Sequence, residues 1–279
     1  MEPTWQTADG AVKLWLGDCL DILPTLEPGS VNMIFTDPPY GHNNNNNNDL
    51  IHRWEAALGC GPVVQEDARP IANDGKKEAS ELVRFLFAQA ARLLPPGCCC
   101  CCCCCGGGGP DPQFARWSLW MDEVLQFKQM VIWDKGPMGM GWHYRRSYET
   151  VLVGEKPGAP CRWFGGRVVE NIIRPGRYGI HKIIPDASQH PTEKCPELAA
   201  HFVRLHSQTH DTILDPFMGS GTTGVACIRT GRRFMGIEID EKFFAVAVKR
   251  IEAELNRTPL FDPKPQVQTD LLAQGEPQT

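Results

Sequence analysis

The sequence has no long hydrophobic run and no excess of positive charge, and each absence excludes a class of protein. No apolar stretch approaches the roughly 20 residues that a membrane-spanning helix needs. The first residues contain no basic region followed by an apolar segment, so we expect a cytoplasmic protein with no membrane contact. The net charge of −5 excludes nucleic-acid binding through the whole surface, so any such contact must use a local basic patch.

The 13 cysteines also lack the spacing of a disulfide framework or a metal site. Eight of them form one run at 98–105, and the others are scattered without tetrahedral metal-type spacing. Adjacent cysteines on a strand point to opposite faces, so they cannot all be paired. Free cysteine behaves as a small buried hydrophobe. We therefore predict that the run is a central strand buried on both faces, and we assign no metal ligands.

Apolar runs bounded by turn signals alternate with segments of helical periodicity, which is typical of an α/β fold. The runs predict strands at 12–16, 31–36, 98–105, 129–134, 148–155, 212–215 and 233–238. Helices are predicted near 19–26, 78–94, 114–124, 196–206, 222–230 and 244–255. In the helix near 114–124 we interpret Trp117 and Trp120 as core residues and not as a base-stacking platform.

Asp37-Pro38-Pro39-Tyr40 follows the apolar run at 31–36, which predicts a strand that delivers these residues to the carboxyl edge of a sheet. Two consecutive prolines remove two backbone donors and leave the carbonyls of Asp37 and Pro38 as rigid acceptors. Acceptors beside an aromatic ring suit a planar base with an amino group, such as an extruded adenine or cytosine. A plain strand that ends in a proline turn is the alternative that this tetrapeptide leaves open.

A G-x-G-x-x-G pattern lies between a predicted strand and a predicted helix, with its glycines at Gly219, Gly221 and Gly224. Glu238 closes the next strand, where an acid can bind ribose hydroxyls, so the context predicts an adenosine-containing cofactor. A nicotinamide dinucleotide is disfavoured because only one helix follows Glu238, whereas a dinucleotide-binding half continues with a further strand. The remaining strands must come from the N-terminal half, which places the glycine turn at one sheet edge with Asp18 and Asp37.

The net charge is positive between Trp142 and Lys182, where the sequence has eight lysines and arginines and three glutamates. Part of this stretch lacks helical periodicity and contains aromatic residues. Arginines for phosphates and guanine edges, beside aromatics that stack or wedge, are typical of a DNA-contacting insert. A solvated basic surface without a partner is the alternative. The candidate DNA-binding residues are Arg145, Arg146, Arg162, Arg167, Arg174, Arg177 and Lys182.

Three motifs together resemble those of the S-adenosylmethionine-dependent DNA amino-methyltransferases. They are Asp37-Pro38-Pro39-Tyr40, the stretch at 215–222, and His190-Pro191-Thr192-Glu193-Lys194. Their order matches the β-class-like group in which the catalytic motif precedes the cofactor motif. The resemblance covers most of residues 12–256. It implies an α/β, Rossmann-like methyltransferase fold with a mostly parallel seven-stranded sheet, helices on both faces and a circularly permuted motif order.

The resemblance also implies roles for the matching residues. The expected catalytic residues are Asp37, Pro38, Pro39 and Tyr40. The expected residues for S-adenosylmethionine are Asp18, Thr192, Lys194, Asp215, Phe217, Gly219, Ser220, Gly221, Thr222 and Glu238. Within this set, Glu238 would hold the ribose hydroxyls, Asp18 would meet the adenine, and Thr192 with Lys194 would bind the carboxylate. Lys194-Cys195-Pro196 displaces the family's proline by one position, which affects the start of the following helix more than the lysine contact.

The implied activity is methyl transfer to the exocyclic N6 amine of adenine in double-stranded DNA, by base flipping and direct displacement. Aspartate as the first motif residue favours adenine, whereas serine would favour cytosine N4. Three alternatives stay open: a cytosine-N4 methyltransferase, an RNA or protein-amide methyltransferase, and a catalytically inactive cofactor-binding module that binds DNA. The family often forms homodimers, so a homodimer is also expected as one arrangement.

These motifs divide the chain into four segments. Residues 1–156 form the catalytic half of the methyltransferase domain, with a long loop at 41–77. Residues 157–189 form the small basic insert for target recognition. Residues 190–256 form the cofactor-binding half of the same domain, and residues 257–279 form a Pro- and Gln-rich tail that we expect to be flexible.

Overall fold

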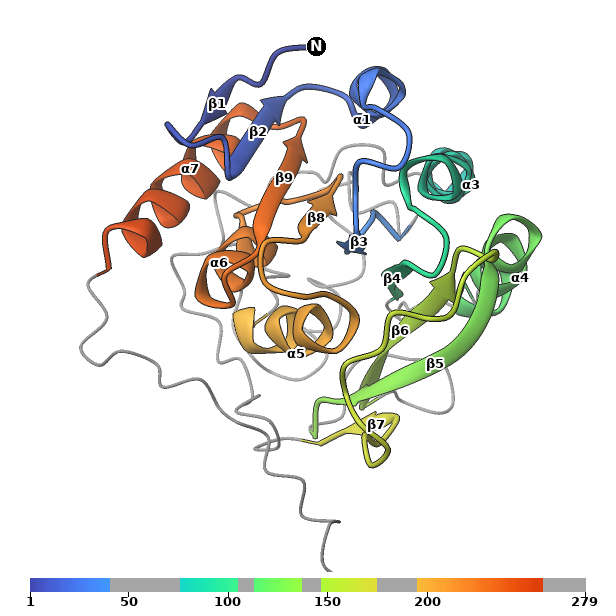
Figure 1. Ribbon diagram of the computed structural model, residues 1–279. Helices are drawn as coiled ribbons and strands as arrows, with labels where there is room; N and C mark the ends of the chain where they lie inside the picture. The colour runs from blue at the N-terminus through green and yellow to red at the C-terminus, as the bar shows by residue number, and fades with distance from the viewer. Residues whose placement is uncertain (41–75, 105–112, 137–146, 175–194, 258–279) are drawn as a thin grey trace, which may run out of the picture.

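A computed structural model describes residues 1–40, 76–104, 113–136, 147–174 and 195–257. The described strands form one sheet in the order β1-β2-β9-β8-β3-β4-β6-β5-β7 (Figure 1). Their bounds are β1 (Trp5–Gln6), β2 (Val12–Leu16), β3 (Met33–Thr36), β4 (Cys99–Cys104), β5 (Gln126–Asp134), β6 (Tyr148–Glu155), β7 (Ile172–Ile173), β8 (Thr212–Asp215) and β9 (Arg233–Glu238). This sheet has two strands more than the seven expected, because the short edge strands β1 and β7 have too few residues to show a pattern in the sequence.

The centre of the sheet is parallel, and it is built from both ends of the chain. β2, β9, β8, β3 and β4 pair in parallel along this order. β6 runs antiparallel to β4 and to β5. Because β8 and β9 lie between β2 and β3, the carboxyl ends of strands from distant parts of the sequence meet at one edge.

The cysteine run forms the central strand that the sequence predicts. β4 pairs with β3 on one side and with β6 on the other. Cys101 and Cys103 pack into the core on one face of the sheet, whereas Cys100 and Cys102 pack into the core on the opposite face. Burial raises the pKa of the Cys100 thiol well above its usual range, so the thiol stays neutral and unreactive. The run therefore acts as a hydrophobic strand.

Helices cover both faces of the sheet (Figure 1). One face packs against α5 (Pro196–His206), α6 (Thr222–Arg229) and α7 (Glu241–Leu255). The other face packs against α1 (Cys19–Ile22), the 3₁₀ helix η1 (Leu23–Thr25), α3 (Lys76–Leu93) and α4 (Gln113–Val124). The predicted helices are thus confirmed to within a few residues. Among the described residues, no helix combines the length and apolar character that crossing a membrane requires.

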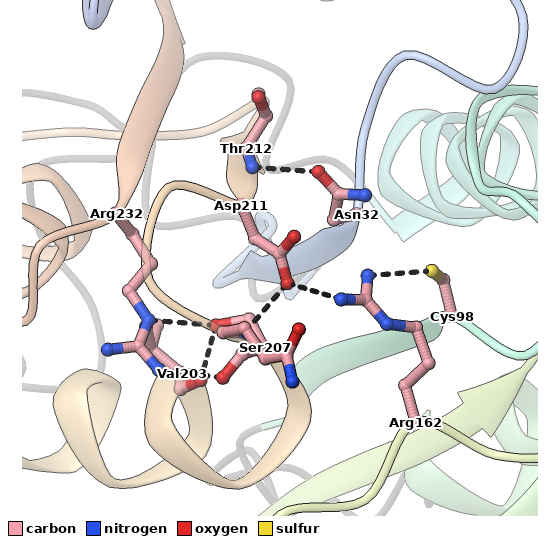
Figure 2. Close-up of polar contacts among 9 residues, drawn as sticks. Asn32, Cys98, Arg162, Val203, Ser207, Asp211, Thr212 and Arg232 are labelled. Carbon is pink, nitrogen blue, oxygen red and sulfur yellow. Dashed lines mark hydrogen bonds and ion pairs between the residues drawn. The ribbon is translucent and has the colours of Figure 1, made fainter.

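The amino edge of the parallel strands has a polar network of its own (Figure 2). Arg162 donates to Asp211 Oδ2 at 2.8 Å and to Cys98 Sγ at 3.6 Å. Asp211 directly precedes β8 and Cys98 directly precedes β4, so Arg162 lies at the edge opposite to Asp37. This position argues against the predicted DNA contact of Arg162, because a base held at Asp37 would lie across the sheet from it. Arg162 instead fixes the segment after β6 to the amino edge.

Candidate active site

The tips of β3 and β8 lie side by side at the carboxyl edge of the sheet. The two strands pair in parallel, with Met33 opposite Ile213 and Ile34 opposite Leu214. Beyond this ladder, the Thr36 hydroxyl donates to Asp215 Oδ1 at 2.8 Å. Thr36 directly precedes Asp37, and Asp215 directly precedes the glycine turn. The two motifs therefore meet at one edge, where open α/β sheets bind their ligands.

Asp37 and Tyr40 lie together at the tip of β3. Both side chains are half-buried, and the Tyr40 hydroxyl donates to Asp37 Oδ1. The Tyr40 ring stacks on the ring of Trp117 from α4, with centroids 6.2 Å apart and an interplanar angle of 24°. Trp117 is fully buried, so it is a core residue as predicted, but it also backs the ring that we expect to stack on a base. Helical spacing identifies Trp117 as a core residue but carries no signal of this contact.

The three glycines of the G-x-G-x-x-G pattern differ in their surroundings. Gly219 has φ +51°, and a Cβ at this position would meet nothing within 4 Å. Gly221 is the N-cap residue directly before α6 and has φ +83°, and a Cβ there would lie 3.0 Å from the Cβ of Ala247 on α7. A Cβ on Gly224 would lie 2.8 Å from both Ile251 and Phe234. Only Gly219 thus offers open space to a ligand, whereas the other two glycines allow close packing.

Asp215 holds this turn in place with both of its carboxylate oxygens. Oδ1 accepts from Thr36 and from the Phe217 backbone at 3.1 Å, and Oδ2 accepts from the Thr223 hydroxyl at 2.6 Å. The side chain is only 3% exposed. Burial raises the pKa of Asp215 to about 6, although its hydrogen bonds act in the opposite direction. These bonds argue against the predicted direct contact of Asp215 with a cofactor.

Glu238 closes the other side of the turn. Its Oε2 accepts from the Gly219 backbone and its Oε1 accepts from the Asp240 backbone, both at 2.9 Å. Burial raises the pKa of Glu238. Asp18 lies at the tip of the neighbouring strand, because Leu16 of β2 pairs with Glu238, and its side chain caps α1 through the Leu20 backbone at 2.9 Å. The two acids thus lie next to each other at the carboxyl edge.

Arg250 on α7 is a further support of the turn that the sequence patterns do not reveal. Its Nη1 donates to the Ser220 carbonyl at 2.9 Å and to the Ser220 hydroxyl at 2.6 Å, and it lies 3.4 Å from the Thr222 hydroxyl. Ser220 is 8% exposed. The Ser220 hydroxyl therefore faces α7, and the contact that it can offer a cofactor is through its backbone.

The family model described as DNA methylase matches residues 31–249, which include both strand tips and the glycine turn. The chain belongs to the DNA methylase family. Among curated relatives of this DNA methylase, "Type II methyltransferase M2.DpnII" of Streptococcus pneumoniae is 27% identical over an alignment of 249 residues, with 85% of this chain and 88% of the relative covered. "DNA adenine methyltransferase YhdJ" of Escherichia coli K12 is 23% identical over 285 residues, with 90% of this chain and 86% of the relative covered.

Solved structures agree with the DNA methylase fold. The complex of M1.HpyAVI with S-adenosylmethionine has a TM-score of 0.56 and 25% identity, and covers 86% of this chain and 99% of that chain. The PvuII DNA methyltransferase, described as cytosine-N4-specific, has a TM-score of 0.63 and 16% identity, and covers 92% of this chain and 94% of that chain. The mixed α/β architecture that the sequence predicts is thus confirmed.

The remaining predicted site residues of this DNA methylase divide into two groups. β5 and β7 run in the same direction as β3 and β4, because β6 is antiparallel to both β4 and β5 and β7 is parallel to β5. Arg174 directly follows β7, so it lies at the same edge of the sheet as Asp37, where it forms a salt bridge of 3.0 Å with Glu170. Arg167 is exposed in the same segment. The residues that lie outside the described part of the chain are Arg145, Arg146, Arg177, Lys182, Thr192 and Lys194.

Proposed function

We propose that this DNA methylase transfers a methyl group from S-adenosylmethionine to the N6 amine of adenine in double-stranded DNA. The main support is the 2.8 Å hydrogen bond between Thr36 and Asp215, because it joins the tip that bears the Asp37 acceptors to the open turn at Gly219. The relative YhdJ is named a DNA adenine methyltransferase, and the solved structure of M1.HpyAVI is a complex with S-adenosylmethionine. Aspartate at the first motif position also favours adenine.

The turn fits an adenosine cofactor with a carboxylate and a positive centre. Gly219 leaves open space beside the start of α6, where free backbone N–H groups favour a negative group. Glu238, which already accepts from the Gly219 backbone, would hold the ribose hydroxyls, and Asp18 would meet the adenine. Thr192 and Lys194 would bind the carboxylate. When bound, S-adenosylmethionine supplies an electrophilic methyl group on its sulfonium.

The tip of β3 would activate the target amine. The lone pair of an adenine amine is conjugated with the ring, which makes the amine a poor nucleophile. Asp37 and the Pro38 carbonyl would accept its hydrogens, draw the nitrogen toward tetrahedral geometry and free the lone pair for direct displacement. Tyr40, backed by Trp117, would stack on the flipped base. Holding the amine in line with the methyl group would supply much of the remaining acceleration.

DNA would approach the carboxyl edge through the predicted basic residues between Trp142 and Lys182. Arg167 and Arg174 belong to this set, together with Arg145, Arg146, Arg177 and Lys182, because cations near the flipped base can pair with phosphates. Arg162 is left out because it is engaged at the amino edge. The four-segment division of the chain, the homodimer and the cytoplasmic location remain predictions.

The decisive experiment identifies the methylated nucleoside. Purified protein is incubated with double-stranded DNA and S-adenosylmethionine that carries a labelled methyl group, and the DNA is digested and analysed by mass spectrometry. We expect N6-methyladenine with the wild type and none with Asp37→Ala. Methyl label on RNA or protein alone, or no transfer by protein that binds S-adenosylmethionine, would refute the proposal.

Cytosine N4 is the second candidate product, because the PvuII enzyme shares the fold and is described as cytosine-N4-specific. Both products come from exocyclic amines, and the same two acceptors could serve either one. N4-methylcytosine in the digest would decide for this candidate. A catalytically inactive DNA-binding module would give neither product. The Asp37 carboxylate beside Tyr40 argues against such a module, because binding DNA alone does not require this pair.

A further inference from the structure

A buried hydrogen-bonded bridge joins the base side and the cofactor side of the proposed site. Thr36 is 0% exposed, Asp215 3% and Thr223 5%. The Thr36 hydroxyl donates to Asp215 Oδ1 at 2.8 Å, and the Thr223 hydroxyl donates to Asp215 Oδ2 at 2.6 Å. One carboxylate thus holds a strand tip and a helix at the same time.

The bridge begins where the backbone pairing ends. The parallel ladder between β3 and β8 consists of Met33 with Ile213 and Ile34 with Leu214, and includes no pair closer to the strand tips. Strands must separate at this point for a ligand to enter the carboxyl edge. Beyond the ladder, the Asp215 carboxylate links the two tips by accepting from the Thr36 hydroxyl.

Each end of the bridge is close in sequence to a group that the reaction uses. Thr36 is bonded to Asp37, whose carboxylate would accept a hydrogen of the target amine. Thr223 lies in the first turn of α6, directly after the turn that contains Gly219. A third contact, from the Phe217 backbone to Asp215 Oδ1 at 3.1 Å, fixes the start of that turn.

We propose that Thr36, Asp215 and Thr223 are positioning residues that set the distance and direction between the target amine and the methyl donor. This inference rests on the proposed function. The three side chains would not touch the reacting atoms, because all are buried and their polar atoms are hydrogen-bonded to one another. Their contribution comes from alignment, since a misplacement of about 1 Å between reacting groups can cost roughly 100-fold in rate.

The test replaces each threonine by valine, which has nearly the same volume, and by the smaller serine. Thr36→Val removes the hydroxyl, whereas Thr36→Ser retains it; Thr223→Val and Thr223→Ser form the second pair. The measurements are the single-turnover rate of methyl transfer at saturating DNA and cofactor, the Kd of S-adenosylmethionine by calorimetry, and the melting temperature. Ser207→Ala is the matched control, because it removes a buried hydroxyl at the opposite edge of the sheet (Figure 2).

We expect each valine variant to lose about 10- to 100-fold in single-turnover rate, while the Kd of S-adenosylmethionine changes less than about threefold. Each serine variant should recover the rate to within about threefold of the wild type. The double valine variant should lose less than the product of the two single losses, because both hydroxyls act through one carboxylate. Ser207→Ala should lower the melting temperature and leave the rate unchanged.

Two outcomes would overturn the bridge while leaving the proposed function intact. One is a wild-type rate in folded Thr36→Val and Thr223→Val. The other is a rate loss that serine does not recover, or that Ser207→Ala reproduces at an equal drop in melting temperature. These comparisons are ratios of each variant's rate to that of an active wild type. If the wild type itself transfers no methyl group to DNA, that result refutes the proposed function, so the two failures can be told apart.

Discussion

Replacing the two positive-φ glycines of the turn by alanine should separate ligand binding from packing. Gly219 and Gly221 both adopt positive φ, at +51° and +83°, but a Cβ on Gly219 meets nothing within 4 Å, whereas one on Gly221 lies 3.0 Å from the Cβ of Ala247. Gly29 is a matched control, since it has φ +69°, open space around it and a position in the turn before β3.

The expected magnitudes follow from these surroundings. A left-handed conformation costs a residue other than glycine about 1–2 kcal/mol, so Gly219→Ala and Gly29→Ala should each lower the free energy of unfolding by that amount. Gly221→Ala adds overpacking against α7, which raises its cost to about 2–5 kcal/mol. The new methyl group of Gly219→Ala would occupy the space proposed for the cofactor and should weaken its binding at least about tenfold, or 1.4 kcal/mol.

Chemical denaturation of the protein without cofactor measures the stability, and calorimetry with S-adenosylmethionine measures the affinity. Gly219→Ala should lose affinity and resemble Gly29→Ala in stability, whereas Gly29→Ala should bind as the wild type does. Wild-type affinity in Gly219→Ala would show that the cofactor does not approach the turn at this residue. Equal stability of Gly221→Ala and Gly29→Ala would refute the argument from packing on α7.

Three further predictions concern single side chains. Asp37→Ala should abolish methyl transfer but leave the Kd of S-adenosylmethionine nearly unchanged, which a filter assay and calorimetry would show; equal transfer by both proteins would remove Asp37 from the mechanism. Arg250→Met should weaken cofactor binding by about 3- to 30-fold, because a charged donor to the Ser220 carbonyl and hydroxyl is lost, and Arg250→Lys should recover part of the affinity in the same titration. Burial lowers the pKa of His206 to about 4, so the unfolded chain binds a proton there below about pH 6.5 while the folded chain stays neutral down to about pH 4. Stability is therefore lost as the pH falls through this window, and urea unfolding at pH 5 and 7.5 should show a smaller pH dependence for His206→Phe than for the wild type; an unchanged dependence would contradict the burial argument.

Much of the local structure could be predicted because the relevant signals lie a few residues apart. The cysteine run could be identified as a central strand from its continuous apolar character, and its described side chains, Cys98 to Cys103, are buried on both faces of the sheet as expected. Because only one helix follows Glu238, the sequence predicted that the N-terminal half supplies the remaining strands of the same sheet. Edge strands β1 and β7, of two residues each, were missed since so short a pair has no periodicity.

The sequence by itself determined the elements, the order of the motifs and the family, because a strand, a glycine turn and a proline-locked tip are each specified by adjacent residues. Only the tertiary structure decided which of the predicted site residues already have hydrogen-bond partners within the protein. It shows that Asp215 is saturated by Thr36 and Thr223, and that Arg162 is paired with Asp211 at the far edge. Thr36 and Asp215 are 179 residues apart, and contacts over such a separation depend on the packing of the whole sheet, which no local pattern encodes.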